Sequence, residues 1–210
     1  MQSQFRDLGE IYKNPFFWRM GVIGFIHNSV YLSYQALWRG PWLRDGAGMS
    51  LPMVAQTLFW FNVGMLMGVL CIGTLAARLQ RIGVDTYIVM GVGIAMSIFI
   101  QCLLAMEQTS VAVYLCFGFG FFGSSPLLIW SIFGQRFPAH LVGKVNTAQN
   151  MLSFIGAFLV QWGVGAVIGF WPERPGGYYD PVGHQTALVL AITIELAAFL
   201  FFLIPSRRRL

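Results

Sequence analysis

Residues 86–106 read TYIVMGVGIAMSIFIQCLLAM, an apolar stretch without a single charged side chain. An α-helix needs about 20 such residues to cross the hydrocarbon core of a bilayer. Lipid offers no hydrogen-bond partner to the backbone, so a segment of this kind is expected to be a helix rather than a strand. The stretch therefore predicts a membrane-spanning helix.

Five further stretches have the same character, and only short loops separate them. The six apolar stretches are 18–38, 53–77, 86–106, 111–135, 145–170 and 185–204. Composition agrees, because 57% of residues are hydrophobic, 10% are charged and the mean hydropathy is +0.66. We expect an all-α membrane protein with six transmembrane helices: an N-terminal arm (1–17), a six-helix bundle (18–204) and a basic tail (205–210).

Lys and Arg are distributed unevenly over the two sides of this arrangement. Six spans put both termini on one side, which holds ten basic residues: Arg6, Lys13, Arg19, Arg78, Arg81, Arg136, Lys144, Arg207, Arg208 and Arg209. The other side holds three: Arg39, Arg44 and Arg174. The positive-inside rule then predicts cytoplasmic termini. The net charge of +5 follows this topology, and no basic face indicates nucleic-acid binding.

The N-terminal arm and the cysteines give no sign of a further domain or of a metal site. The N-terminal arm is expected to form a short amphipathic helix that ends near Asn14 and Pro15. Three cysteines lie inside predicted spans without metal-ligand spacing, so they are interpreted as small apolar filler: Cys71, Cys102 and Cys116. No metal site and no cofactor are expected.

The first stretch carries a stripe of polar and aromatic residues. They recur every three or four residues, which places them on one helical face: His27, Tyr31, Tyr34, Gln35 and Trp38. Such a face is expected to line a cavity or to contact a partner helix. Anchoring at the membrane interface is the alternative, and it suits Trp38, Arg39 and Trp42. For the deeper residues both interpretations stay open: His27, Asn28, Tyr31 and Gln35.

The fifth stretch has the most regular polar pattern. Asn146, Gln149, Asn150 and Ser153 occupy positions i, i+3, i+4 and i+7, and Gln161 extends the same face. Amides in hydrocarbon need partners, which are other helices, water or substrate. Asn150, Ser153 and Gln161 are therefore predicted to line a substrate cavity, with hydrogen bonding between helices as the alternative.

Two other stretches add candidates for the same cavity. Gln56 and Trp60 form a short polar set in the second stretch, and Ser124 and Ser125 precede Pro126 in the fourth. Proline removes a backbone hydrogen bond, which predicts a kink at this point. Transporters use interrupted helices to expose backbone along the substrate path, and a plain packing kink is the alternative.

Three motifs, in this order and spacing, resemble the second half of a major facilitator superfamily transporter. They are residues 14–19 (NPFFWR) with 35–45 (QALWRGPWLRD), residues 73–83 (GTLAARLQRIG) and residues 143–150 (GKVNTAQN). The middle motif is similar to the family's cytoplasmic loop signature through Gly73, Arg78, Arg81 and Gly83. Ala77 stands where that signature has aspartate, and Gln80 where it has its second glycine.

The resemblance implies one half of a twelve-helix fold, built from 3+3 inverted repeats, in a bacterial inner membrane. It implies secondary active transport of a small solute by alternating access. Because the first half is expected to be missing, the chain would need a second six-helix half or a second copy. The alternatives are an inactive truncated gene product and a six-helix assembly subunit of a membrane complex.

Glu195 is the only acidic residue deep in a predicted span. An ionised carboxylate there is costly, so the group is expected to be protonated, paired or in contact with water. It is either a proton-coupling group or a neutral acid that hydrogen-bonds a neighbouring helix. The second interpretation is preferred, because the resembled fold places its last helix at the periphery.

No catalytic constellation is recognised, so an enzyme is not expected. The three histidines lie on separate predicted elements: His27, His140 and His184. The sequence also has no phosphate-binding loop and no serine elbow. No arginine is expected to be buried as the mark of an obligate anion site. The expected partners are a small solute and the lipid bilayer.

Overall fold

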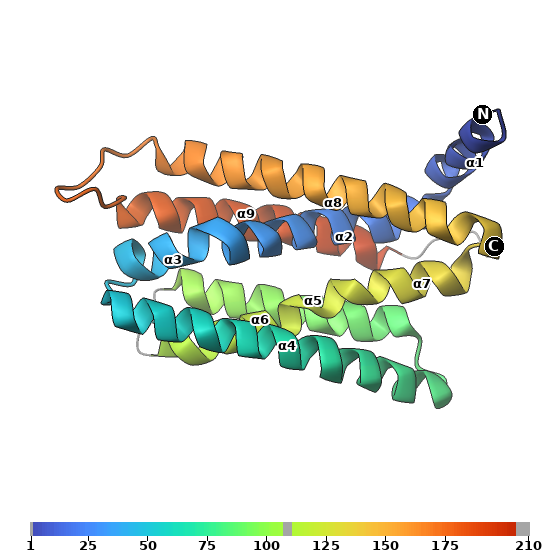
Figure 1. Cartoon of the computed structure of the whole chain (residues 1–210), viewed down its shortest axis with the longest axis horizontal. Coiled ribbons are helices and arrows are strands. Elements are labelled where there is room, and N and C mark those ends of the chain that lie inside the picture. Colours follow the sequence, from blue (N-terminus) through green and yellow to red (C-terminus); the bar gives the residue numbers. More distant parts are fainter. Residues whose placement is uncertain (1, 107–110, 205–210) are drawn as a thin grey trace.

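The structure is a computed structural model that describes residues 2–106 and 111–204. In this part of the chain the regular elements are helices, and the long ones run side by side along the bundle (Figure 1). The predicted basic tail, 205–210, lies outside the described residues. The helices are α1 (Gln2–Lys13), α2 (Pro15–Ser33), η1 (Tyr34–Trp38), α3 (Arg39–Pro41), η2 (Trp42–Gly46), α4 (Leu51–Arg81), α5 (Thr86–Ala105), α6 (Ala112–Gly123), η4 (Ser125–Leu128), α7 (Ile129–Arg136), α8 (Ala139–Ile168) and α9 (Pro181–Leu203).

Five helical segments among the described residues are long and apolar enough to cross a membrane: Leu51–Arg81, Thr86–Ala105, Ala112–Arg136, Ala139–Ile168 and Pro181–Leu203. They correspond to five of the six predicted stretches, and they give the chain the character of an all-α integral membrane protein. The first predicted stretch is not among them. Its helix α2 carries Arg19, His27 and Asn28, which lower its hydropathy. Six spans therefore stay a prediction.

Helix α2 continues beyond Ser33 through two π-helical turns. In the first turn the Arg39 N–H donates to the Tyr34 carbonyl, and in the second the Ala47 N–H donates to the Trp42 carbonyl. Each bond spans five residues instead of four, so each turn holds an extra residue. The side chains that follow are rotated back around the helix relative to a continuous α-helix. This rotation decides where Arg39 points.

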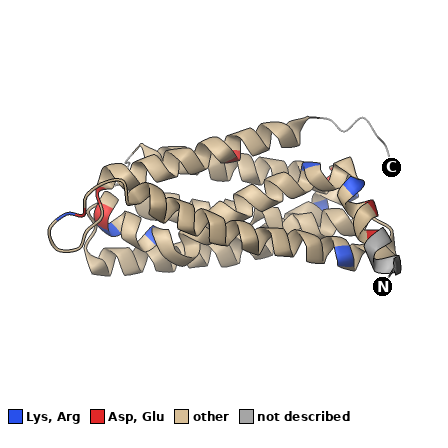
Figure 2. Ribbon diagram, turned by 90° about the horizontal axis from the view of Figure 1, so that it is seen from above, with Lys and Arg blue, Asp and Glu red and all other residues tan. Residues whose placement is uncertain are grey.

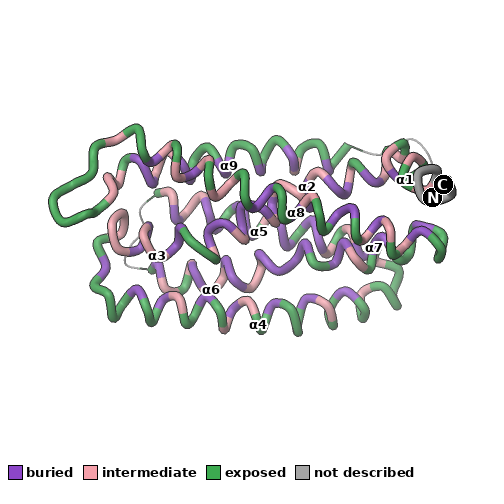
Figure 3. Tube along the Cα trace, turned by 45° about the horizontal axis from the view of Figure 1, so that its top comes forward, coloured by how far each residue is buried: buried purple, intermediate pink, exposed green. Residues whose placement is uncertain are grey.

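The long helices pack in two groups. Helix α2 packs against α8 and α9, whereas α4 packs most extensively against α6, with α5 alongside α6. In Figure 1 the first group occupies the upper part of the bundle and the second group the lower part. Helix α5 also contacts α9 and joins the two groups. Buried residues follow the inner sides of the helices, and the outer side of α4 is largely exposed (Figure 3).

Glycines allow α4 and α6 to approach closely. A methyl group at Gly64 or Gly68 would lie 2.2 Å from the carbonyl oxygen of Phe117 or Phe121, and one at Gly120 would lie 2.2 Å from that of Phe61. No real side chain tolerates such contacts, so the two backbones meet directly. Gly64 and Gly68 are four residues apart, the small-residue spacing that lets helices in membranes approach closely.

Most charged residues lie near the two ends of the bundle (Figure 2). The predicted amphipathic helix of the arm is present as α1, which buries Ile11 and forms an ion pair from Asp7 to Lys144 at the start of α8. The Asn14 side chain accepts a hydrogen bond from the Phe16 N–H at 2.9 Å and caps α2, as its position before Pro15 predicts.

Candidate functional site: buried polar groups inside the bundle

Three polar side chains from three helices meet in the interior. His27 of α2 and Glu195 of α9 have no exposed surface, and their Nδ1 and Oε1 atoms lie 3.3 Å apart. Gln101 of α5 is 1% exposed, and its Nε2 donates to the second carboxyl oxygen, Oε2, at 2.6 Å. We call these three residues the His27–Glu195 cluster. It connects the two groups of helices.

The two titratable groups of the His27–Glu195 cluster lie side by side without a hydrogen bond between them. Among the described residues, neither Nδ1 of His27 nor Oε1 of Glu195 has a hydrogen-bond partner, although the two atoms are 3.3 Å apart. A net charge on buried groups is costly in an apolar bundle. The second interpretation of Glu195 from the sequence includes a hydrogen bond to a neighbouring helix, and in the structure Gln101 of α5 donates one to its carboxyl group. Gln101 is missing from the predicted site, although it is the one amide in the stretch 86–106.

A second buried charge lies at Arg39 in the three-residue helix α3. The side chain is 3% exposed, and the guanidinium carbon lies 4.3 Å from the ring centre of Phe119, 5.1 Å from that of Phe61 and 5.7 Å from that of Tyr34. One terminal nitrogen contacts Cys116 Sγ at 3.6 Å, and Nε has no acceptor. Among the described residues, no carboxylate lies within ion-pair distance of this guanidinium.

Anchoring at the membrane interface, the alternative that suits Trp38, Arg39 and Trp42, stays a prediction, and all three side chains are buried in the protein. One expectation from the sequence is wrong, because an arginine is buried where none is expected. The π-turn η1 directly precedes Arg39, and its extra residue brings Arg39 toward the helical face of Tyr34.

The predicted kink in the fourth stretch is confirmed. Helix α6 ends at Gly123, a short 3₁₀ helix holds Pro126, and α7 continues the segment. Pro126 has no N–H for the Phe122 carbonyl, and the Ser125 hydroxyl donates to that oxygen instead at 2.6 Å. The Ser124 hydroxyl donates to the Phe121 carbonyl at 2.7 Å. Both serine side chains thus bind their own backbone in this conformation.

The remaining cavity candidates lie in separate places. Tyr31 is buried and its hydroxyl donates to the Gly120 carbonyl at 3.2 Å. Asn28 and Ser153 line a hollow of about 10 Å³ beside Gln149. Gln35 is partly buried and its Nε2 lies 3.3 Å from Met65 Sδ.

The other four candidates, from α4 and α8, are farther out. Gln56 and Trp60 are exposed and line an outward-facing hollow of about 560 Å³ between α4 and α6. Asn150 is exposed on α8. Gln161 is partly buried, and its backbone carbonyl accepts from the Trp38 indole at 3.0 Å. The structure therefore brings together only some of the predicted residues.

The loop motif lies at the end of α4. Gly73 and Arg78 belong to the helix, and Arg81 is its last residue. Gly83 has φ +89°, a left-handed conformation that glycine adopts without strain, and it ends the helix. Both arginines are exposed.

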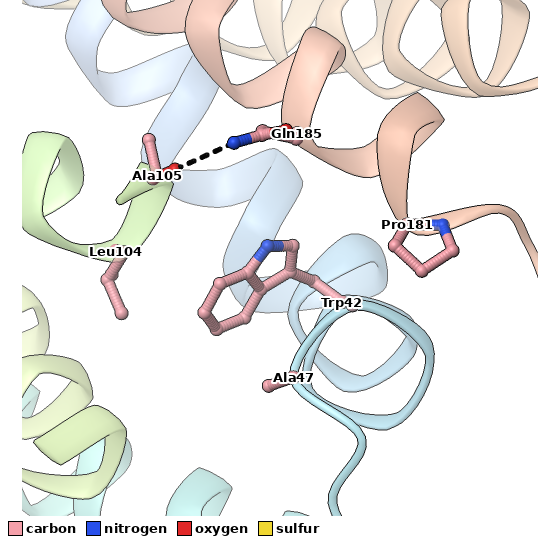
Figure 4. Close-up of a pocket in the computed structure, with 7 residues that line it drawn as sticks. Trp42, Ala47, Leu104, Ala105, Pro181 and Gln185 are labelled. Atoms are coloured by element: carbon pink, nitrogen blue, oxygen red, sulfur yellow. Dashed lines mark hydrogen bonds between the residues drawn. The ribbon is translucent and has the colours of Figure 1, made fainter. Parts of the chain in front are cut away.

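At the opposite end of the bundle the helices pack around Trp42. Figure 4 shows the Trp42 indole between the ends of α5 and α9, where Gln185 Nε2 donates to the Ala105 carbonyl at 3.2 Å. The hollow left there is about 10 Å³, room for at most one water molecule.

The sequence matches no protein-family model and no curated protein.

Proposed function

We propose that the chain is a secondary transporter of a small solute, working by alternating access and coupled to protons through the His27–Glu195 cluster. The observation that carries the proposal is this cluster itself. Ionisable side chains inside apolar helices are costly and are typical of ion and proton pathways. Packing alone would favour apolar residues at these positions.

A second observation supports the resemblance to one half of a major facilitator transporter. The six-span proposal divides the long helices into two sets of three: α2, α4, α5 and α6–α7, α8, α9. Helix α4 packs on α6 as α2 packs on α8, and α5 packs on α6 as α9 packs on α2. In this division α2 corresponds to α6–α7, α4 to α8 and α5 to α9. Replacing each helix by its counterpart leaves the list of packed pairs unchanged, as expected for 3+3 inverted repeats.

The proposal includes a second six-helix bundle, either another half or a second copy, which would complete the cavity wall. The polar side chains exposed on α4 and α8 suit such a surface: Gln56, Trp60 and Asn150. We place the protein in a bacterial inner membrane with cytoplasmic termini, following the charge bias. The loop motif at Gly73, Arg78, Arg81 and Gly83 would then face the cytoplasm.

Transport is tested by flux into vesicles. The protein is isolated from its own membrane in mild detergent, so that any second bundle stays attached, and is reconstituted with an inward proton gradient. The vesicles receive a mixture of sugars, amino acids and carboxylic acids, and retained solutes are identified by mass spectrometry. We expect gradient-dependent accumulation of at least one solute. The variant Glu195→Gln should lose the dependence on the gradient, whereas Glu173→Gln, an exposed loop residue, should behave like the wild type.

Two results would contradict the proposal. If no solute accumulates, the transport proposal is wrong. A stoichiometric partner of unrelated fold in the isolated protein would then favour an assembly subunit of a membrane complex. The absence of any partner would favour an inactive truncated gene product. If a solute accumulates equally with Glu195→Gln, the assignment of coupling to the His27–Glu195 cluster is wrong.

A further inference from the structure

We infer that Arg39 binds the solute and that this solute is an anion, a carboxylate or phosphate; the inference rests on the proposed transport function. It begins from the permanent charge of the guanidinium, which cannot be deprotonated in a protein. Arg39 is 3% exposed, so its charge lies in the protein interior. A buried charge normally has a paired opposite charge.

The neighbours of Arg39 do not supply that opposite charge. Three aromatic rings and a thiol surround it, and Nε is without an acceptor. The carboxyl group buried inside the bundle, Glu195, contacts His27 and Gln101 instead. The uncompensated charge leaves an interior that favours a bound anion.

The backbone around Arg39 is an independent observation. Helix α3 is only three residues long and lies between the π-turns η1 and η2. Single π-turns inside α-helices occur frequently at functional sites. Without η1, Arg39 would lie on a different face from Tyr34, so the irregular turn is what brings the charge inward. The helix therefore departs from regular geometry at the residue that carries the charge.

Position in the bundle adds a third observation. Arg39 lies where α3, in the chain of α2, meets Phe61 of α4 and Phe119 of α6. These residues belong to the two different groups of helices, and the close backbone contacts hold α4 and α6 together as one unit. An anion bound to the guanidinium would therefore lie between the two groups of helices.

Binding is tested directly, without transport. Thermal unfolding of the purified protein in lipid nanodiscs is followed by tryptophan fluorescence in titrations with acetate, benzoate, succinate and inorganic phosphate. Acetamide, benzamide and succinamide are the neutral counterparts of the three carboxylates. We expect at least one anion to raise Tm while its neutral amide does not. Arg39→Ala removes the charge that pairs with the anion, so the affinity for the anion should fall more than about tenfold. Arg39→Lys, which keeps the charge but not the fork of donors, should lie between.

Arg174→Ala is the matched control, because Arg174 is exposed in the loop before α9 and should bind the anion like the wild type. If the wild type shows no difference between any anion and its amide, and none with phosphate, the anion assignment is wrong; that comparison needs no variant to fold. If an anion binds equally to Arg39→Ala, Arg39 is not the site. Anion binding without flux would instead contradict the transport proposal and leave this inference standing.

Discussion

Asp45 ties the loop before α9 to the end of the α2 helix. Its carboxylate has no exposed surface and accepts from Arg44 Nη2 at 2.9 Å and from the Tyr179 backbone N–H at 3.0 Å. His184 Nε2 lies 3.8 Å away. Burial acts to raise the pKa of Asp45, but the hydrogen bonds from Arg44 and Tyr179 outweigh it, so the pKa is lowered. The ionised carboxylate is thus favoured by the folded state.

This lowered pKa gives a prediction for stability against pH. The stabilisation by Asp45 is fully present above the ordinary aspartate pKa of 3.8 and is lost as the pH falls through the lower folded value. Asp45→Asn should therefore lower Tm at neutral pH and flatten the loss of Tm on acidification. Thermal unfolding in detergent over a pH series measures both. Asp85→Asn, at an exposed carboxylate 3.9 Å from Arg136, is the control and should change the profile little. If Tm depends on pH identically in Asp45→Asn and in the wild type, ionised Asp45 does not stabilise the fold.

At the scale of elements, the direct contact of α4 with α6 predicts unequal effects of two similar substitutions. Gly64→Ala places a methyl group against the Phe117 carbonyl and should destabilise the bundle by about 1–3 kcal/mol, as overpacking does. Gly73→Ala on the same helix meets nothing within 4 Å and should be neutral or stabilising by up to about 1 kcal/mol. Unfolding in denaturant compares the two variants. Equal effects would mean that the α4–α6 contact is not close.

The elements also show how far the sequence predicts this molecule. Apolar length predicts α4, α5, α8 and α9, because a lipid-facing helix must be apolar along a whole span. Pro126 predicts the break after α6. The π-turns are not predicted, because one extra residue in a turn leaves no mark on apolar length. The buried Arg39 depends on that extra residue, so its place in the candidate site could not be predicted either.

For the molecule as a whole, the open question is whether α2 crosses the membrane. More than half of its residues are buried, against α8 and α9 among others. Only surface that faces lipid has to be apolar, so a span enclosed by other helices can carry His27 and Asn28. Its low hydropathy therefore agrees with an inner span. In the packed bundle α2 lies alongside α8 and α9, and α3 continues it toward one end of the molecule (Figure 1).

Labelling of single cysteines decides the topology. In a background where Cys71, Cys102 and Cys116 are changed to Ala, cysteine replaces one exposed residue before α2, one after η2 and one at the end of α4: Lys13, Ser50 and Gln80. If α2 spans, a membrane-impermeant thiol reagent added to intact cells should label Ser50→Cys alone, because Lys13 and Gln80 then lie together on the cytoplasmic side. Labelling after lysis should reach all three and serves as the control. If Lys13→Cys and Ser50→Cys are labelled together, α2 does not cross, and the division into two sets of three spans is wrong. Labelling of Lys13→Cys and Gln80→Cys without Ser50→Cys would instead keep six spans and reverse their orientation.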